Sequence, residues 1–237
     1  MNKSDNSHNI IRILSKLGVC SRKQAVELVK QKRVKINGRV ARYASEKASL
    51  KDIILIDNKP ALKKKHRYIM LHKPAGYVTT RKDEKDRKTV YELLRGIDDW
   101  VFPVGRLDKD SEGLLIFTND TAFGDKLTDP ANFITRTYEV LVDGVVSQDE
   151  SRKILKGVDI GRGEKSAPVS LRVLEAGLLS TSLEIVLTEG KNREIRRLFE
   201  ALGRPVKRLV RTRFGNFALG SLKSGQWKEL DADKAKA

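Results

Sequence analysis

Hydrophobic and polar positions at the start of the chain predict a small α/β unit. Apolar residues at helical spacing predict a helix over 10–17, and Ser21 is a good N-terminal cap for a second helix. Residues 34–40 alternate between apolar and polar around an Asn-Gly pair, which is typical of a β-hairpin. We therefore expect a small domain at 1–60. The basic run at 61–67 has no periodicity and is expected to be a linker.

The pattern changes at residue 68 to many short strands with few helices. Strands are expected at 68–72, 101–104, 113–118, 137–142, 169–174, 181–188, 206–210 and 227–230. Helices are expected at 88–95, 120–127, 147–156 and 192–202. Because strands dominate and helices are interspersed, we expect an α+β fold with a mostly antiparallel mixed sheet in a second domain at 68–237. The charged end, 231–237, is expected to fray.

The charge of the chain restricts the classes of partner. The 237 residues include 48 Lys+Arg and 31 Asp+Glu, a formal net charge of +17. Residues 1–67 hold 18 of the basic and 5 of the acidic residues, a net charge of 18 − 5 = +13. Such an excess predicts attraction to nucleic acid or to an anionic membrane. Because no apolar run approaches the ~18 residues that span a bilayer, we expect nucleic acid and no membrane.

The residue inventory points away from cofactor chemistry. Three scattered histidines and one cysteine do not form a metal-ligand pattern, and the chain has no Walker loop. Gly161-Arg162-Gly163 is an isolated and weak glycine pattern. We expect no metal and no cofactor. Cys20 cannot form an internal disulfide and the first residues are polar, so the expected compartment is the cytoplasm.

The segment Gly105-Arg106-Leu107-Asp108 is expected to form a turn between two apolar strands. A loop held between buried strands is where positioned catalytic groups are often found. An aspartate in a turn more often bonds the local backbone. The residues alone therefore favour a structural role for Asp108.

The longer run GRLDKDSEGLLIFTND changes this interpretation. It closely resembles the signature of the pseudouridine synthases that act on ribosomal RNA, within the group that includes RsuA, RluB, RluE and RluF. Ser111 and Gly113 stand where that pattern requires them, and the resemblance spans essentially the whole chain. It implies an isomerase that breaks the glycosidic bond of a flipped-out uridine, rotates the uracil and rejoins it through carbon. Asp108 matches the aspartate that is essential in that family.

Two further segments complete the catalytic set that the resemblance implies. Arg136-Thr137-Tyr138-Glu139-Val140 resembles the family's basic-x-Tyr-x-Val strand, whose tyrosine lies beside the target uracil. A tyrosine in an alternating strand is otherwise usually core packing. The run KNREIRRLF at 191–199 matches the segment that places a basic residue against the aspartate, and the alignment selects Arg196. Direct pairing there would lower the pKa of Asp108.

Basic residues in several segments are candidates for RNA binding. Residues 17–23 and 34–38 resemble the alpha-L RNA-binding motif, although that motif commonly has glycine where this chain has Lys32. The HKPAG run at 72–76 resembles the family's Asn-Lys-Pro-x-Gly loop, where the lysine either approaches the substrate or lies in a simple turn. Residues 191–213 hold nine basic and two acidic residues, which favours an RNA-facing surface. The candidates are Arg22, Lys23, Arg33, Lys35, Lys73, Arg106, Lys191, Arg193, Arg197 and Arg211.

These features predict isomerisation of one uridine in ribosomal RNA, in the large subunit more than the small. We expect the partner to be ribosomal RNA or an assembly intermediate of the ribosome, and the protein to be a monomer. The main alternative is a non-catalytic protein that binds ribosomal RNA or assists assembly, but binding alone needs no carboxylate near a phosphate-rich ligand. An RNA glycosidase usually needs two carboxylates, and only Asp110 and Glu112 lie near Asp108 in sequence. An RNA methyltransferase would need a cofactor fingerprint that the chain lacks.

Overall fold

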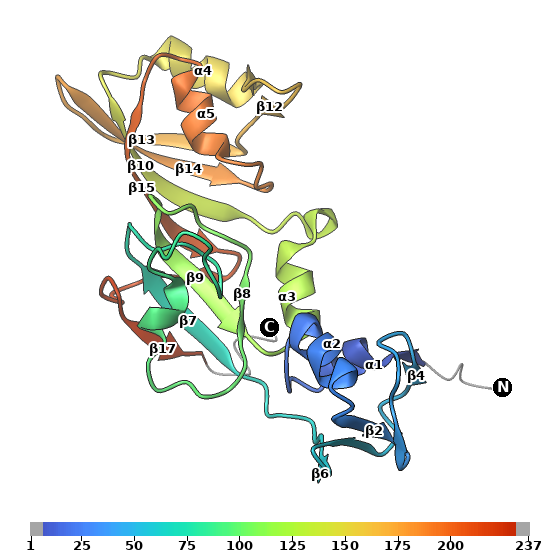
Figure 1. The fold of residues 1–237 in the computed structure, drawn as a ribbon. Helices are drawn as coiled ribbons and strands as arrows, with labels where there is room; N and C mark the ends of the chain where they lie inside the picture. Colours follow the sequence, from blue (N-terminus) through green and yellow to red (C-terminus); the bar gives the residue numbers. More distant parts are fainter. Residues whose placement is uncertain (1–6, 231–237) are drawn as a thin grey trace.

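The N-terminal part of the chain, blue in Figure 1, folds around an apolar core of its own. The structure is a computed structural model that describes residues 7–230, so the end expected to fray, 231–237, lies outside the described residues. Helices α1 (Ile10–Lys16) and α2 (Arg22–Lys30) pack together, and the Ser21 hydroxyl caps α2 by accepting from the Gln24 amide at 3.1 Å. The strands are β1 (His8–Asn9), β2 (Val34–Ile36), β3 (Arg39–Val40), β4 (Lys47–Ala48), β5 (Ile54–Ile56) and β6 (Lys59–Pro60).

Lys32 stands in the turn between α2 and β2 with a backbone φ of +59°. A residue with a side chain pays roughly 1–2 kcal/mol in this left-handed region, which explains why the motif that this segment resembles commonly has glycine there. Hydrogen bonds from the amides of Lys32 and Arg33 to the carbonyl oxygens of Val29 and Leu28 keep the turn tight.

The remainder of the chain builds one nine-stranded sheet with the strand order β13-β14-β10-β15-β9-β7-β17, with β8 paired to β9 and β16 paired to β15. Every pairing in it is antiparallel except that of β15 with β9. This confirms the α+β class and the mostly antiparallel mixed sheet. The strands are β7 (Tyr68–Lys73), β8 (Phe102–Val104), β9 (Glu112–Thr118), β10 (Arg136–Asp143), β13 (Ser170–Ala176), β14 (Ser180–Leu187), β15 (Val206–Phe214), β16 (Phe217–Ala218) and β17 (Trp227–Glu229).

Helices and one small hairpin are attached to this sheet. The expected helix over 88–95 is only a 3-10 turn, η1, and the one expected over 192–202 is shorter because Arg193 adopts a left-handed φ of +50° before it. The elements are η1 (Val90–Leu93), α3 (Thr121–Thr128), η2 (Pro130–Asn132), α4 (Gln148–Lys156), β11 (Val158–Asp159), β12 (Lys165–Ser166) and α5 (Glu194–Glu200). Figure 1 shows α4, α5 and β12 together at one end of the sheet, and α3 beside the N-terminal part.

Residues 61–67 have no helix or strand, yet contacts with both neighbouring parts hold them. The Lys64 amide donates to the carbonyl oxygen of Leu17 at 2.9 Å. Asn119, which is fully buried, donates to the carbonyl oxygen of Lys65 at 3.0 Å and accepts from the Arg67 amide at 2.8 Å. The basic run that predicted a self-repelling linker is therefore fastened at its backbone.

The two halves of the large sheet meet along a seam of only two residue pairs, Val210 with Glu112 and Arg211 with Gly113. Figure 1 shows this junction of β15 and β9 as the narrow middle of the molecule. Gly113 has a φ of +104°, and a Cβ at this position would lie 2.3 Å from the carbonyl oxygen of Arg211. Only glycine lets the two strands approach this closely. The ion pair of Arg208 with Glu112, 3.0 Å, also crosses the seam.

We predict that Gly113→Ala lowers the free energy of unfolding by about 2–4 kcal/mol, because the new methyl group must displace β15 and strain its own backbone. Gly161→Ala is the matched control: Gly161 also has a positive φ, +77°, but no atom within 4 Å of a Cβ. Denaturant unfolding of the two variants separates the contact from the backbone strain, for which we expect about 1–2 kcal/mol. Equal losses would contradict a close approach at the seam.

Candidate active site

Asp108 lies in the loop that joins β8 to β9, immediately before the seam. Thr79 fixes this loop, because its hydroxyl donates to the carbonyl oxygen of Leu107 at 2.7 Å and accepts from the Leu107 amide at 3.3 Å. The Ser111 amide donates to the carbonyl oxygen of Asp108 at 3.1 Å. The carboxylate, 35% exposed, therefore projects from a backbone that is held on both sides. Thr79 carries no sequence signal for this role, since its partner is 28 residues away.

The Asp108 side chain lines a pocket of about 300 Å³. That volume is at the lower end of the ~300–1,000 Å³ that small-ligand sites occupy. Tyr138 from β10, a residue 9% exposed, lines the same pocket, and Arg106 and Arg196 line it as well. The structure thus brings the three residues of the expected catalytic set to one pocket, and their individual roles stay predictions.

The ion pair of Asp108 differs from the expected one. Arg193 makes it, with its Nη1 3.7 Å from Asp108 Oδ2, and Arg196 forms no ion pair with a described residue. Arg196 instead donates from Nη2 to the carbonyl oxygen of Asp110 at 2.8 Å and from Nη1 to that of Val206 at 3.3 Å. Because α5 begins only at Glu194, Arg193 lies just before the helix and supplies the cation that pairs with Asp108. Arg196, inside the helix, contacts the backbone of the loop. Burial lowers the pKa of Arg196, and the charge of Arg193 lowers it further.

Lys73 does not face solvent, so its expected role in RNA binding is not supported. It is fully buried, and its Nζ donates to the carbonyl oxygens of Ser111 at 2.6 Å, Pro74 at 3.1 Å and Lys109 at 3.2 Å. Burial lowers the pKa of Lys73 to about 8, although Asp108, Asp110 and Glu112 act in the opposite direction. Lys73 therefore fastens the loop that carries Asp108 from inside the protein.

Some of the basic residues at 191–213 are engaged inside the protein, and the expected RNA-facing surface stays a prediction for the others. Arg197, expected to bind RNA, pairs with Glu164 at 2.5 Å and donates to carbonyl oxygens of residues 160 and 161, so it anchors the β11–β12 hairpin. Arg211, expected there too, is only 2% exposed. Further cations of this run and of the N-terminal part are engaged in ion pairs: Lys191 with Glu189, Arg204 with Glu150, Lys207 with Asp143, Arg208 with Glu112 and Arg33 with Asp57.

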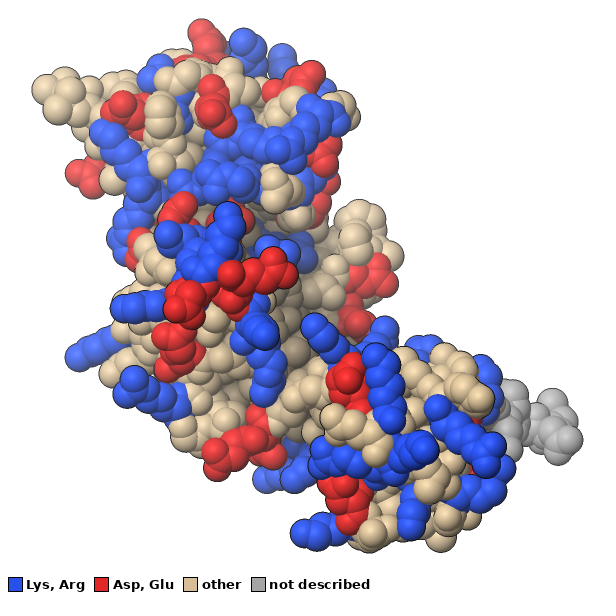
Figure 2. Space-filling view, viewed as in Figure 1, with Lys and Arg blue, Asp and Glu red and all other residues tan. Residues whose placement is uncertain are grey.

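The other RNA-binding candidates have accessible side chains. Arg22, Lys23, Arg106 and Arg193 are exposed, and Lys35 is half-buried. Figure 2 shows lysine and arginine spread over the N-terminal part and gathered again around the middle and upper parts of the same face. None of the helices in the described part of the chain is long and apolar enough to cross a membrane.

Comparison with known proteins decides the family. The sequence model for RNA pseudouridylate synthase matches residues 67–201, and that for the S4 domain matches residues 10–54. The chain belongs to the RNA pseudouridylate synthase family. It is 38% identical, over 94% of its length and 90% of the relative's, to an "uncharacterized RNA pseudouridine synthase" of Aquifex aeolicus (strain VF5).

Two other relatives extend this likeness. The chain is 33% identical to "ribosomal large subunit pseudouridine synthase B" of Bacillus subtilis (strain 168), over 95% of its length and 93% of the relative's. A solved structure described as a pseudouridylate synthase superposes with a TM-score of 0.69 at 26% identity, covering 97% of this chain and 98% of that one. The protein is thus a pseudouridine synthase with an N-terminal S4 domain.

We predict that Lys73→Met lowers kcat by about 10- to 100-fold and leaves RNA affinity unchanged, because a misplaced catalytic group is costly at this scale. Above about pH 8 the wild-type amine loses its proton and with it one N–H donor, so kcat should fall there. The variant should lack this decline. Lys109→Met, which alters an exposed lysine of the same loop, is the control and should lower affinity only. A loss of affinity in Lys73→Met would instead indicate contact with RNA.

Proposed function

We propose that this pseudouridine synthase isomerises one uridine of ribosomal RNA, with Asp108 acting on the flipped-out nucleotide. The observation that carries the proposal is a half-buried carboxylate in a pocket lined by a tyrosine ring and several arginines. The cations of such a pocket favour a phosphate-rich ligand. Breakage of the glycosidic bond and formation of the carbon–carbon bond leave no net redox change, so the side chains of the pocket suffice.

Each member of the pocket has a distinct proposed task. Tyr138 stacks on the flipped uracil, which is worth about 1–3 kcal/mol per base and offsets part of the cost of flipping. Arg193 balances the charge of Asp108, to which it is paired. Arg196 holds the backbone at Asp110, and through it the loop that presents the carboxylate. Arg106, exposed at the rim of the pocket, contacts the nucleotide.

We further propose that residues 1–60 bind RNA as a unit while 68–237 perform the chemistry, in a monomer. We propose RNA of the large ribosomal subunit as the substrate, supported by the name of the relative from Bacillus subtilis. The alternative, a binding or assembly protein, would use the same exposed basic residues. It would leave Asp108 without a task.

Asp108→Asn should abolish pseudouridine formation and preserve RNA binding, because the amide cannot act as nucleophile or base. Asp110→Asn is the matched control, since Asp110 is exposed two residues further along the same loop. Labelling-based pseudouridine mapping of ribosomal RNA, from cells that lack the gene and cells complemented with each variant, makes the comparison. One position should lose its label without the gene and regain it only with active protein. Turnover by Asp108→Asn would refute the assignment.

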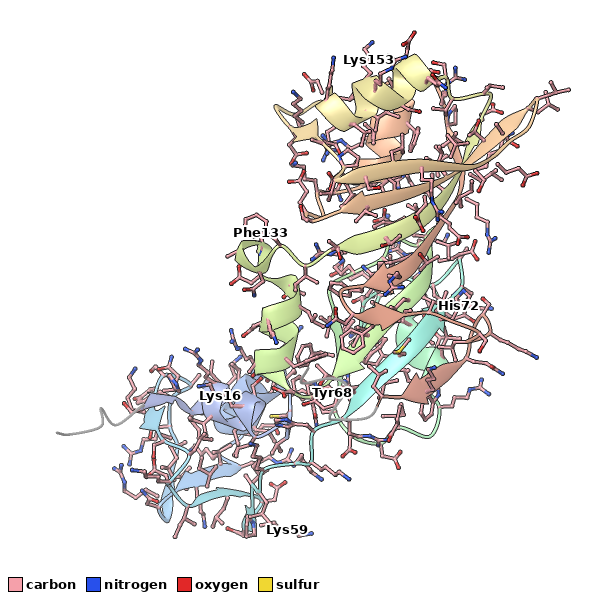
Figure 3. The ribbon with its side chains drawn as sticks, turned by 180° about the vertical axis from the view of Figure 1, so that it is seen from behind. Lys16, Lys59, Tyr68, His72, Phe133 and Lys153 are labelled. Carbon is pink, nitrogen blue, oxygen red and sulfur yellow. The ribbon has the colours of Figure 1, made fainter. Side chains whose placement is uncertain are left out.

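Arg22→Gln and Lys23→Gln should each weaken RNA binding and reduce the slope of log affinity against log salt by about 0.7–0.9 per lost phosphate contact. At saturating RNA, kcat should stay at the wild-type value, because both residues lie in the N-terminal part. Lys153→Gln is the control: Lys153 is exposed on α4, at the opposite end of the molecule from Lys16 and Lys59 in Figure 3. An unchanged slope in both N-terminal variants would exclude these residues from the RNA interface.

A further inference from the structure

A second pocket, of about 360 Å³, adjoins the one that holds Asp108. The two pockets share Arg106, Tyr138 and Gly190 in their walls. Arg136 and Arg211 line only the second pocket, so three arginines surround it. The chemistry described above uses the first pocket and gives the second no ligand.

Arg211 is the unusual group at this place. Its side chain is among the largest fully buried ones of the described residues, and the residue is 2% exposed. Its Nε donates to the carbonyl oxygen of Leu114 at 2.8 Å, but the buried Nη2 has no hydrogen-bond partner in the described part of the chain. No carboxylate of a described residue lies within 4.0 Å of its guanidinium. Burying a charge without a counter-ion is strongly unfavourable, so an anion bound in the second pocket, which Arg211 lines, would stabilise this guanidinium.

Arg136 adds a second positive charge against the same aromatic ring. The guanidinium carbons of Arg136 and Arg211 lie 5.0 Å and 4.9 Å from the ring centroid of Phe214. Arg136 donates from Nη1 to the carbonyl oxygens of Thr188 at 3.0 Å and Ile134 at 3.3 Å, which are neutral acceptors. Burial lowers the pKa of Arg136, and the charge of Arg211 lowers it further. Both side chains are thus preorganised by stacking and by backbone contacts.

The acidic groups close to this cluster already have partners. Glu189 lines the second pocket and pairs with the Nζ of Lys191. Glu194 accepts from the Ser166 hydroxyl at 2.7 Å and from the Lys191 amide at 3.0 Å. Arg106, on the wall between the two pockets, is exposed and makes no ion pair with any residue between 7 and 230. The cluster therefore carries a positive charge that the protein does not neutralise.

We propose that the second pocket binds a phosphodiester of the substrate RNA adjacent to the target nucleotide, with Arg211 as its buried anchor. This inference rests on the proposed function and extends it to the backbone of the substrate. Guanidinium groups present paired N–H donors that match phosphate oxygens. Because both pockets meet at Arg106 and Tyr138, a bound phosphate would fix the distance between the backbone and the nucleotide that enters the pocket of Asp108.

The test removes the negative charge of one RNA phosphate, the positive charge of one arginine, or both. A ribosomal RNA fragment that the wild-type protein binds is prepared as a set, each member with one neutral methylphosphonate in place of a phosphate. Affinity is measured for the wild-type protein, Arg211→Gln and Arg213→Gln. Arg213 is the matched control, because it lies on the same strand two residues on and is exposed. Binding is the readout, so the result does not depend on turnover.

For the wild-type protein, one methylphosphonate position should weaken binding by about 10- to 100-fold, the value of a lost charge-assisted hydrogen bond. Arg211→Gln should bind the unmodified RNA about 10- to 100-fold more weakly than the wild type does. The methylphosphonate at that one position should cause no further loss of affinity in Arg211→Gln, whereas it should still weaken binding of Arg213→Gln. The proposal would be overturned if every methylphosphonate weakened binding of Arg211→Gln as much as it weakens binding of the wild type. It would also be overturned if no methylphosphonate weakened binding of the wild type.

Arg136→Gln serves as the second variant if Arg211→Gln fails to fold, since Arg136 is only half-buried. It should lose sensitivity at the same methylphosphonate position, and retention of full sensitivity there would count against the pocket. Failure of the proposed function gives a different result: the mapping experiment would then show no uridine that depends on the gene, whatever the phosphates contribute to binding.

Discussion

The close approach of β9 and β15 at Gly113 is the constraint on which the rest of the structure depends. The backbone of Arg211 occupies the space that a side chain at position 113 would need. Register then aligns one row across four strands: Tyr138 on β10 pairs with Arg211 on β15, Arg211 with Gly113 on β9, and Gly113 with Lys73 on β7. Because Asp108 lies in the loop that leads into β9, this row places its carboxylate and the tyrosine ring in one pocket.

Two members of this row, Lys73 and Arg211, are buried cations that contact the backbone of β9 and of the loop before it. Lys73 donates to the carbonyl oxygens of Lys109 and Ser111 ahead of β9, and Arg211 donates to that of Leu114 within it. Burying each charge opposes folding unless strong acceptors surround it. These contacts with carbonyl oxygens hold the start of β9 and the loop before it, which carries Asp108.

The hydrophobic pattern was a good guide to strands, and the family resemblance selected residues that meet in one pocket, but neither predicted the contacts of individual cations. Strand periodicity depends on local alternation, so the strands over 113–118 and 137–142 could be predicted within a residue or two of their bounds. Arg197 and Arg211 were expected at the RNA surface, but their contacts are to residues 37 and 97 positions away. The number of charged residues in a segment of sequence does not indicate which of them will contact distant parts of the chain. The pairing of Asp108 with Arg193 depended likewise on where α5 begins.

Positive charge is distributed over two kinds of place, which suit two tasks: retaining the RNA and positioning it relative to the pocket of Asp108. Exposed cations on the N-terminal part would interact with phosphates in a solvated environment, where salt screens the charges and no fixed geometry is imposed. Beside Phe214, Arg211 is buried and Arg136 is half-buried, and neither has a carboxylate partner among the described residues, so a phosphate there would be held by direction as well as by charge. A protein that must present one uridine to one carboxylate needs both kinds of contact. Under the proposed function, the first would retain the RNA near the pocket, and the second would set which nucleotide can reach Asp108.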